Sequence, residues 1–172
     1  DNEGVNPDHA LAVKYYKLAA DQSEIIAQCN LARAYTHGLG VQQDHTLAAK
    51  YYKLAADQGI SQAQTNLGGM YYNGQLLQRD RALAVKYFKL AADRGLAHAQ
   101  RNLGAAYAGG NGVKQYFRVA ISYFKLAAKQ GLTKATAALG RIIRVGTRVQ
   151  VSALTSSNSD LNGSEGTVTK TL

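Results

Sequence analysis

The sequence predicts an all-α protein, an α-solenoid in which pairs of helices repeat along one axis. Near-copies of the phrase KYYKLAAD begin at Lys14, Lys50, Lys86 and Ser122, always 36 residues apart. Apolar residues inside each unit recur at helical spacing, and turn residues separate the helices at the same interval. A unit of this length cannot bury its apolar face alone, so neighbouring units must stack.

The first predicted helix of each unit has an apolar stripe on one face. The stripe consists of Ala27, Leu31, Ala32 and Tyr35, then Ala63, Leu67, Gly68 and Tyr71, then Ala99, Leu103, Gly104 and Tyr107, and finally Ala135, Leu139, Gly140 and Ile143. A glycine inside a helix costs about 1 kcal/mol relative to alanine. Because glycine recurs at positions 68, 104 and 140, we expect a neighbouring helix to pass too close there for a side chain.

The second predicted helix follows the same spacing, with Ala48, Ala49, Tyr52, Ala55 and Ala56 in the best-formed unit. Its start and end are marked by residues suited to helix caps. We expect Asp8, Asp44 and Asp80 to cap the second helices, Gly59, Gly95 and Gly131 to follow them with Ser23 in the first unit, and Gly38, Gly74 and Gly110 to end the first helices.

The resulting pattern is A-x-x-x-L-G-x-x-Y-x-x-G-x-G-V-x-x-D-x-x-x-A-x-x-Y-Y-x-x-A-A-x-x-G. It resembles the Sel-one-like repeat family, relatives of the tetratricopeptide repeats. The resemblance implies a right-handed α-solenoid of antiparallel helix pairs, with adaptor or scaffold roles and no chemistry of its own. Some secreted bacterial members have a cysteine pair in every unit, which this chain lacks. The predicted organisation is a half unit 1–24, full units 25–60, 61–96 and 97–132, a final first helix 133–143, and a β-rich tail or cap 144–172.

The last capping position departs from the pattern. Tyr116 replaces the capping aspartate, Phe117 follows it, and Lys114 and Arg118 flank the pair. A lost cap costs about 1 kcal/mol, so the two aromatic residues are expected to gain contacts elsewhere. They could pack on the chain's own tail or anchor a partner, or the position could have drifted without a role.

The tail after residue 143 changes from helical periodicity to strand-like alternation. Residues Thr147–Val151 and Thr167–Thr169 alternate as strands do, and turn-forming residues lie between them. This segment resembles the opening strands of a small SH3-like or KOW-type β-barrel. Two strands cannot close a barrel. The predicted hairpin either caps the last helix or adds strands to a partner's sheet edge.

Charge is unevenly distributed along the chain, whose net charge is +9. Residues 1–60 have five basic and seven acidic residues, whereas residues 61–144 have thirteen and two. The basic half could face an acidic protein, anionic lipid or RNA, or it could be solvated surface. No apolar run approaches the roughly 20 residues of a membrane span, so no transmembrane segment is expected, and peripheral membrane contact through a protein partner remains an option.

No constellation of residues points to catalysis. Cys29 is the single cysteine, which excludes an internal disulfide framework and favours a reducing interior, the cytosol or an organelle stroma or matrix, over secretion. His9 and His45 lie beside capping aspartates without a third metal ligand. Cys29 and His37 lack an orienting group, and no phosphate-binding glycine loop follows a strand. We therefore expect no enzymatic activity, metal or cofactor.

A binding surface is easier to place. Asn30, Asn66 and Asn102 recur on the first helices, and if those helices form the inner curve they could hydrogen-bond an extended peptide backbone. The alternative is that they bond to adjacent helices or water. A lysine ladder on the second helices fits solvated surface better than a phosphate track; it consists of Lys14, Lys17, Lys50, Lys53, Lys86 and Lys89.

The sequence thus favours a protein-interaction scaffold or adaptor, an accessory subunit of a multi-subunit complex. The alternative is an RNA-associated factor that uses the basic half and the KOW-like tail. The candidate partner-binding residues are Asn30, Arg33, His37, Asn66, Asn73, Asn102, Lys114, Tyr116, Phe117, Arg118 and Arg141.

Overall fold

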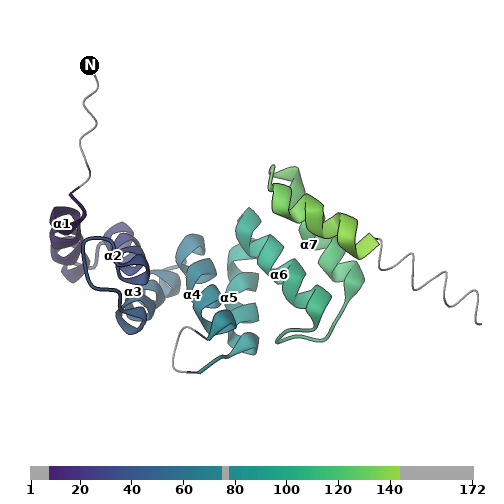
Figure 1. Cartoon of the computed structure of the whole chain (residues 1–172), viewed down its shortest axis with the longest axis horizontal. Helices are drawn as coiled ribbons and strands as arrows, with labels where there is room; N and C mark the ends of the chain where they lie inside the picture. The colour runs from purple at the N-terminus through teal and green to yellow at the C-terminus, as the bar shows by residue number, and fades with distance from the viewer. Residues whose placement is uncertain (1–7, 75–77, 144–172) are drawn as a thin grey trace, which may run out of the picture.

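The chain forms an elongated rod of antiparallel helices, with the first and last helices at opposite ends (Figure 1). The computed structural model describes residues 8–74 and 78–143, and all regular secondary structure in these ranges is α-helical. The helices are α1 (His9–Asp21), α2 (Ile25–His37), α3 (His45–Asp57), α4 (Ser61–Asn73), α5 (Arg81–Asp93), α6 (Ala97–Gly109), α7 (Phe117–Lys129) and a last helix over 133–143. The predicted all-α repeat solenoid is confirmed. The predicted β-rich tail, 144–172, lies outside the described residues.

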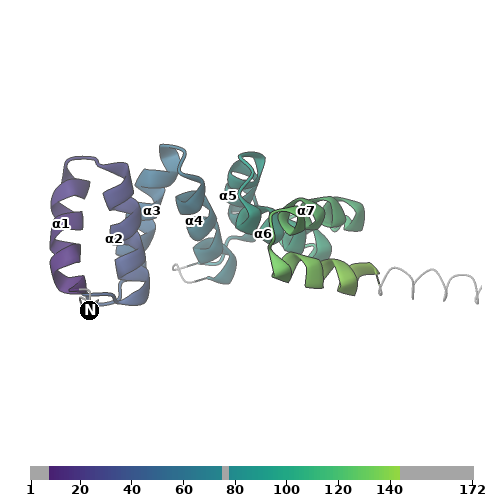
Figure 2. The same ribbon diagram turned by 90° about the horizontal axis from the view of Figure 1, so that it is seen from above.

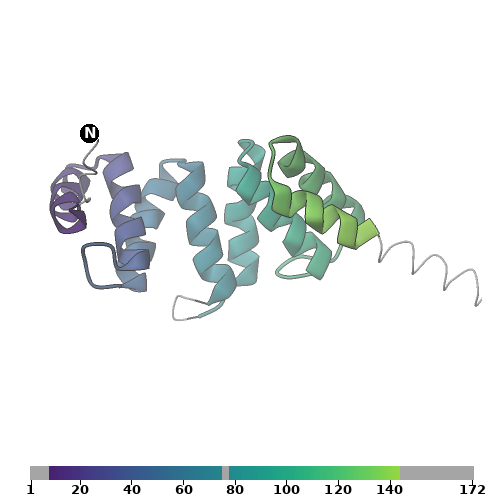
Figure 3. The ribbon, with the colours of Figure 1, turned by 45° about the horizontal axis from the view of Figure 1, so that its top comes forward.

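Each helix packs mainly against the next helix in the chain, α1 on α2 and so on to α7. The view from above shows these neighbours side by side along the rod (Figure 2), and the tilted view keeps the same order (Figure 3). The core is correspondingly a thin strip of small residues, with one buried leucine in each of α2, α4 and α6 and one buried ring in each of α3, α5 and α7. These six side chains are Leu31, Leu67, Leu103, Tyr52, Phe88 and Phe124. Because most contacts join sequence neighbours, the fold is nearly one-dimensional.

Two glycines in the first helices allow the next helix to approach closely, as predicted. A Cβ atom added to Gly68 would lie 2.8 Å from the ring of Phe88, and one added to Gly104 would lie 3.1 Å from the ring of Phe124. Gly140 is different. Among the described residues nothing lies within 4 Å of a Cβ placed there, and the chain that follows this helix lies outside the described residues.

Helix ends follow the predicted punctuation. The carboxylates of Asp8, Asp44 and Asp80 accept hydrogen bonds from backbone amides in the first turns of α1, α3 and α5. Tyr116 takes the same position before α7 without a side-chain hydrogen bond. The predicted turn residues have positive φ; they are Ser23, Gly38, Gly59, Gly74, Gly95, Gly110 and Gly131.

A row of buried glutamines, which the sequence analysis missed, recurs once in each full unit. It consists of Gln28, Gln64 and Gln100. Gln58 Nε2 donates to Gln28 Oε1 at 3.3 Å, and Gln130 Nε2 donates to Gln100 Oε1 at 3.0 Å. Between them the equivalent position is Arg94, which donates to the carbonyl of Gly59. Gln64 Oε1 is consequently buried without a hydrogen-bond partner.

Candidate functional site

A groove runs along the rod, made of four hollows that share lining residues. The hollows have volumes of about 70, 550, 260 and 380 Å³ in order from α1 to the last helix. Asn30 and Arg33 line the first two hollows, Asn73 and Asn102 line the second and third, and Arg101 lines the third and fourth. The hollows are therefore parts of one continuous surface. We call this surface the groove.

The groove is built mainly from four rows, each a single repeat position on successive first helices. One row is nearly constant, with Asn30, Asn66, Asn102 and Ala138. Three rows vary from unit to unit; they are Cys29, Thr65, Arg101 and Ala137, then Arg33, Gly69, Ala105 and Arg141, then Gln62, His98 and Lys134. The 36-residue period thus places equivalent residues along one line on the protein surface.

The structure brings together seven of the eleven predicted partner-binding residues. Asn30, Arg33, His37, Asn66, Asn73 and Asn102 line the largest hollow, and Arg141 lines the one at the far end. The other four lie outside the groove, in the loop before α7 and in its first turn; they are Lys114, Tyr116, Phe117 and Arg118. Tyr116 and Phe117 remain 48% and 44% exposed, and Lys114 Nζ lies 5.6 Å from the Tyr116 ring centroid.

Sequence reasoning missed most groove residues that do not recur as the same amino acid, and six of them are polar side chains on the variable rows. They are Cys29, Gln62, Thr65, His98, Arg101 and Lys134. Each occupies a repeat position that lies on the groove in other units too. A signal was present for Gln62, His98 and Lys134, because each lies four residues before a position of the constant row and such positions share a helix face.

Among the described residues, the groove lining has cations and no carboxylate. The cations are Arg33, Arg101, Lys134 and Arg141, and His9, His37 and His98 add imidazoles. The acidic residues of the described ranges lie elsewhere. Three cap helices, Asp57 and Asp93 pair with lysines on the second helices, and Asp21 and Glu24 are exposed near the α1–α2 turn.

Hydrogen bonds hold part of the constant row in place. Asn66 Oδ1 accepts from Gln62 Nε2 at 3.0 Å, and Asn102 Oδ1 accepts from Arg101 at 2.6 Å. Burial raises the pKa of Tyr52 beneath them, while hydrogen bonds with Thr36 and Asn66 oppose that rise. Two of the three asparagines therefore already bond to side chains of this protein. In the described ranges, Asn30 makes no such bond.

The one thiol in the groove is not activated. Burial raises the pKa of Cys29, and the positive charge of Arg33 only partly offsets this effect. A raised pKa reduces the thiolate fraction near neutral pH, and the thiolate is the nucleophile. Within residues 8–74 and 78–143, no three His, Cys, Asp or Glu side chains gather as metal ligands. No helix there has the length and apolarity needed to cross a membrane.

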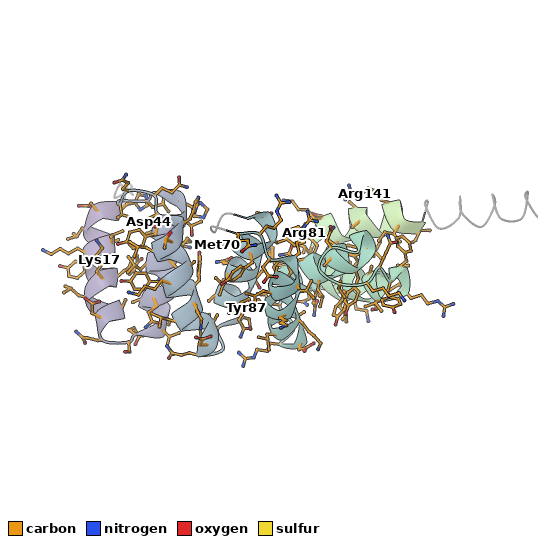
Figure 4. All side chains as sticks on the ribbon, turned by 90° about the horizontal axis from the view of Figure 1, so that it is seen from below. Lys17, Asp44, Met70, Arg81, Tyr87 and Arg141 are labelled. Atoms are coloured by element: carbon orange, nitrogen blue, oxygen red, sulfur yellow. The ribbon has the colours of Figure 1, made fainter. Side chains whose placement is uncertain are left out.

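The second helices present a different surface. Lys53 and Lys89 form ion pairs with Asp57 and Asp93 at 2.6 and 2.8 Å, and hydrogen bonding to these carboxylates raises the pKa of both lysines. Each pair lies beside stacked tyrosines contributed by the next unit, such as Tyr71 and Tyr87 with centroids 6.1 Å apart. Lys17 and Tyr87 of this surface are labelled in Figure 4, as are Met70 and Arg141 of the groove.

Comparison with known protein families identifies the repeat. The Sel1 repeat profile matches residues 2–24, 25–60, 61–96 and 97–132. The chain belongs to the Sel1 repeat family. Sel1 repeats form a non-enzymatic type of protein-interaction scaffold, and they typically mediate contacts with protein partners.

Solved structures of other Sel1 repeat proteins are similar. One is c5321, a protective antigen present in uropathogenic Escherichia coli strains and displaying an SLR fold; it is 36% identical, with a TM-score of 0.78 over 84% of this chain. A Sel1 repeat protein from Oxalobacter formigenes is 34% identical, with a TM-score of 0.75 over 83% of this chain. The alignments span only 31% and 58% of those two proteins.

A more distant similarity concerns the fold alone. Helicobacter pylori cysteine rich protein B is 22% identical, with a TM-score of 0.60; the alignment covers 81% of this chain and 100% of that one. Among curated proteins, a search finds no match.

Proposed function

We propose that this Sel1 repeat protein is an interaction scaffold that binds an extended segment of a partner protein along the groove, as an accessory subunit of a larger assembly. The observation that supports this proposal is the arrangement of rows. One row of asparagines stays constant over three units, while the rows beside it change.

The constant row suits the backbone of a peptide, which is the same at nearly every residue. Every peptide residue except proline presents one N–H donor and one C=O acceptor on the main chain. The side chain of asparagine offers both a donor and an acceptor. Asn30, Asn66 and Asn102 would therefore hold the backbone of an extended segment at regular intervals.

The variable rows suit the part of a peptide that differs between partners. A thiol, a hydroxyl and a guanidinium follow one another at Cys29, Thr65 and Arg101. Such a series discriminates between side chains, because each one favours a different contact.

The RNA-associated alternative has the basic charge of residues 61–144 in its favour. Binding of single-stranded nucleic acid also relies on exposed aromatic rings on which bases stack. Of the rings that line the groove, Tyr52, Phe88 and Phe124 are only 2–3% exposed, and Tyr16 and Tyr72 are half-buried. The protein-binding proposal accounts for more of the groove.

Two further elements belong to this proposal. Residues 144–172 would form the predicted β-cap or pair with a partner's sheet. Tyr116 and Phe117, exposed beside Lys114 and Arg118, would supply a second contact outside the groove.

The test is selection of displayed random peptides of about 12 residues, which extend to about 40 Å, on the full chain. The groove variant combines Asn30→Ala, Asn66→Ala and Asn102→Ala. The matched control combines Lys14→Ala, Lys50→Ala and Lys86→Ala, which have the same period on the second helices and do not line the groove.

Selected peptides should bind the control variant as tightly as the unmodified chain and bind the groove variant at least about tenfold more weakly, a loss of about 1.4 kcal/mol. They should also slow the reaction of Cys29 with a thiol reagent, since Cys29 lines the same hollow as Asn30. Absence of selectable peptides, or equal binding to both variants without protection of Cys29, would contradict the proposal.

A further inference from the structure

We infer that the bound segment is acidic and inserts an apolar side chain into the hollow at the α6 end of the groove. This inference rests on the proposed function and specifies the chemistry of the partner. It concerns the hollow of about 380 Å³ between α6, α7 and the helix 133–143.

The floor of this end hollow is apolar. It is formed by Ala105, Ala108, Phe124, Ala137, Ala138 and Ile142. In the largest hollow, the positions equivalent to Ala105, Ala137 and Ala138 are polar except for one glycine. They are Arg33 and Gly69, then Cys29 and Thr65, then Asn30 and Asn66. The alanines at positions 105, 137 and 138 leave room for a side chain of the bound segment. Burial of apolar surface stabilises binding by about 25 cal/mol per Å².

The same hollow is bordered by positive charge. Arg101, Lys134 and Arg141 line it, and none of the described aspartates or glutamates does. Arg101 has a neutral hydrogen-bond partner, Asn102. A carboxylate beside the apolar side chain would therefore meet charged donors, and hydrogen bonds of this kind are about twice as strong as neutral ones.

Charge is arranged differently on the second helices. Lys53 and Lys89 there have carboxylate partners four residues away. The four cations of the groove lining have no such partner in the described ranges. The groove therefore complements a segment that brings its own carboxylates, and a basic segment would be repelled.

Position along the rod sets the order of side chains in the segment. Three of the four groove cations border the end hollow, while Arg33 lies at the α2 end among amide and imidazole groups. We therefore expect an apolar residue flanked by aspartate or glutamate at one end of the segment and neutral polar residues at the other.

The peptide selection described above tests this inference by composition. Selected peptides should be enriched at least about twofold in Asp and Glu and should have an apolar residue among them. Their binding should weaken as salt rises, because exposed charges are screened.

A charge-reversal pair locates the effect. Arg101→Glu with Arg141→Glu should weaken binding of a selected peptide at least about tenfold, as expected for a charge-assisted contact. Lys125→Glu with Lys129→Glu makes the same change in net charge at exposed positions of α7 outside the groove. This control should change the dissociation constant by less than about twofold, since distant exposed charges are screened.

Filling the hollow tests the apolar anchor. Ala105→Trp, at an exposed position of the hollow lining, should reduce binding as strongly as the charge reversal. Ala10→Trp, an exposed alanine of α1 that lines no hollow, should not. Unfolding curves of both tryptophan variants should match that of the unmodified chain.

Three results would overturn the inference. In the first, selected peptides depend on the asparagine row for binding but are not enriched in Asp and Glu. That result would support the scaffold proposal and contradict an acidic partner. Tighter groove-dependent binding of a single-stranded RNA of the same length would replace the peptide with nucleic acid. Crosslinks from a photo-reactive p-benzoylphenylalanine at position 105 to residues 144–172 of the same chain would make the chain's own tail the occupant.

Discussion

The helix pairs α2–α3 and α6–α7 have nearly the same geometry with different residues at three key positions. In the first pair Ala32 and Tyr52 belong to one core cluster, and Asp44 caps α3. In the second pair Gly104 lies opposite Phe124, and Tyr116 precedes α7. The tyrosine stacks of the two pairs have centroids 6.1 and 6.0 Å apart.

The backbone at the two capping positions is also nearly identical. Asp44 has φ −147° and ψ 102°, and Tyr116 has φ −143° and ψ 98°. The amide of Asp44 donates to the carbonyl of Tyr35 at 3.0 Å, and the amide of Tyr116 donates to that of Tyr107 at the same distance. The backbone bond and packing thus set the loop, and the capping side chain adds stability without determining the shape. The differences between the pairs should therefore appear in stability before they appear in structure.

The largest effect is expected at the close contact of the second pair. Gly104→Val would place methyl groups against the Phe124 ring and the Ala120 carbonyl oxygen, which lies 3.2 Å from an added Cβ. Overpacking of this kind costs about 3 kcal/mol, measurable by urea unfolding. Gly140→Val is the matched control, because the described residues leave its Cβ position open. Equal destabilisation by both changes would contradict the packing account.

The capping difference should be reversible in both directions. Asp44→Ala should lower the free energy of unfolding by about 1 kcal/mol, since it removes the acceptor for two amides of the first turn. Tyr116→Asp should raise it by a similar amount, because the backbone there already has the capping geometry. Thermal unfolding followed by circular dichroism measures both, and a loss of stability in Tyr116→Asp would show that Tyr116 makes a contact worth more than a cap.

In the pair between these two, α4–α5, Arg94 takes the position that Gln58 and Gln130 occupy in the other pairs. Arg94→Gln should restore the bond to the buried Gln64 Oε1, as Gln130 bonds to Gln100, and should keep a donor for the Gly59 carbonyl, as Gln130 does for Gly95. We expect a gain of about 1 kcal/mol in unfolding free energy. Gln130→Arg should have the opposite sign, and a gain there would contradict the pairing.

The smallest effect is expected at the turn after α1. Ser23 has φ 65°, whereas the equivalent turns have Gly59, Gly95 and Gly131. Ser23→Gly should stabilise the chain by about 0.5 kcal/mol, since only glycine adopts this conformation without strain. Gly95→Ser, which adds the same strain at an open position, should destabilise it by a similar amount in the same thermal assay.

The period predicted much of this architecture because each helix and each cap recurs. Asp44, Gly59 and Gly68 are visible in the sequence through their copies in other units. The asparagine row was predicted for the same reason, and the structure places it in a groove. The function of that row stays a prediction.

The remaining features could not be predicted from residues that recur at the 36-residue period. Arg101 and Lys134 are basic only in their own unit, so nothing in the repeat pattern distinguishes them from solvated surface. The glutamine row was overlooked because a polar residue beside an apolar stripe is expected to be exposed. Gln64 and Gln100 are buried instead, and their side-chain amides donate hydrogen bonds to the carbonyls of Ala56 and Ala92. The end hollow depends on small residues at positions 105, 137 and 138, and an absence of bulk becomes visible only in three dimensions.

Packing mainly between sequence neighbours also has a mechanical consequence. A rod of this kind bends easily, because small rotations at successive interfaces between units add up along its length. A peptide bound across several of these interfaces would restrict the rotation at each of them. Binding would therefore stiffen the rod and fix the orientation of its far end for as long as the peptide stays bound.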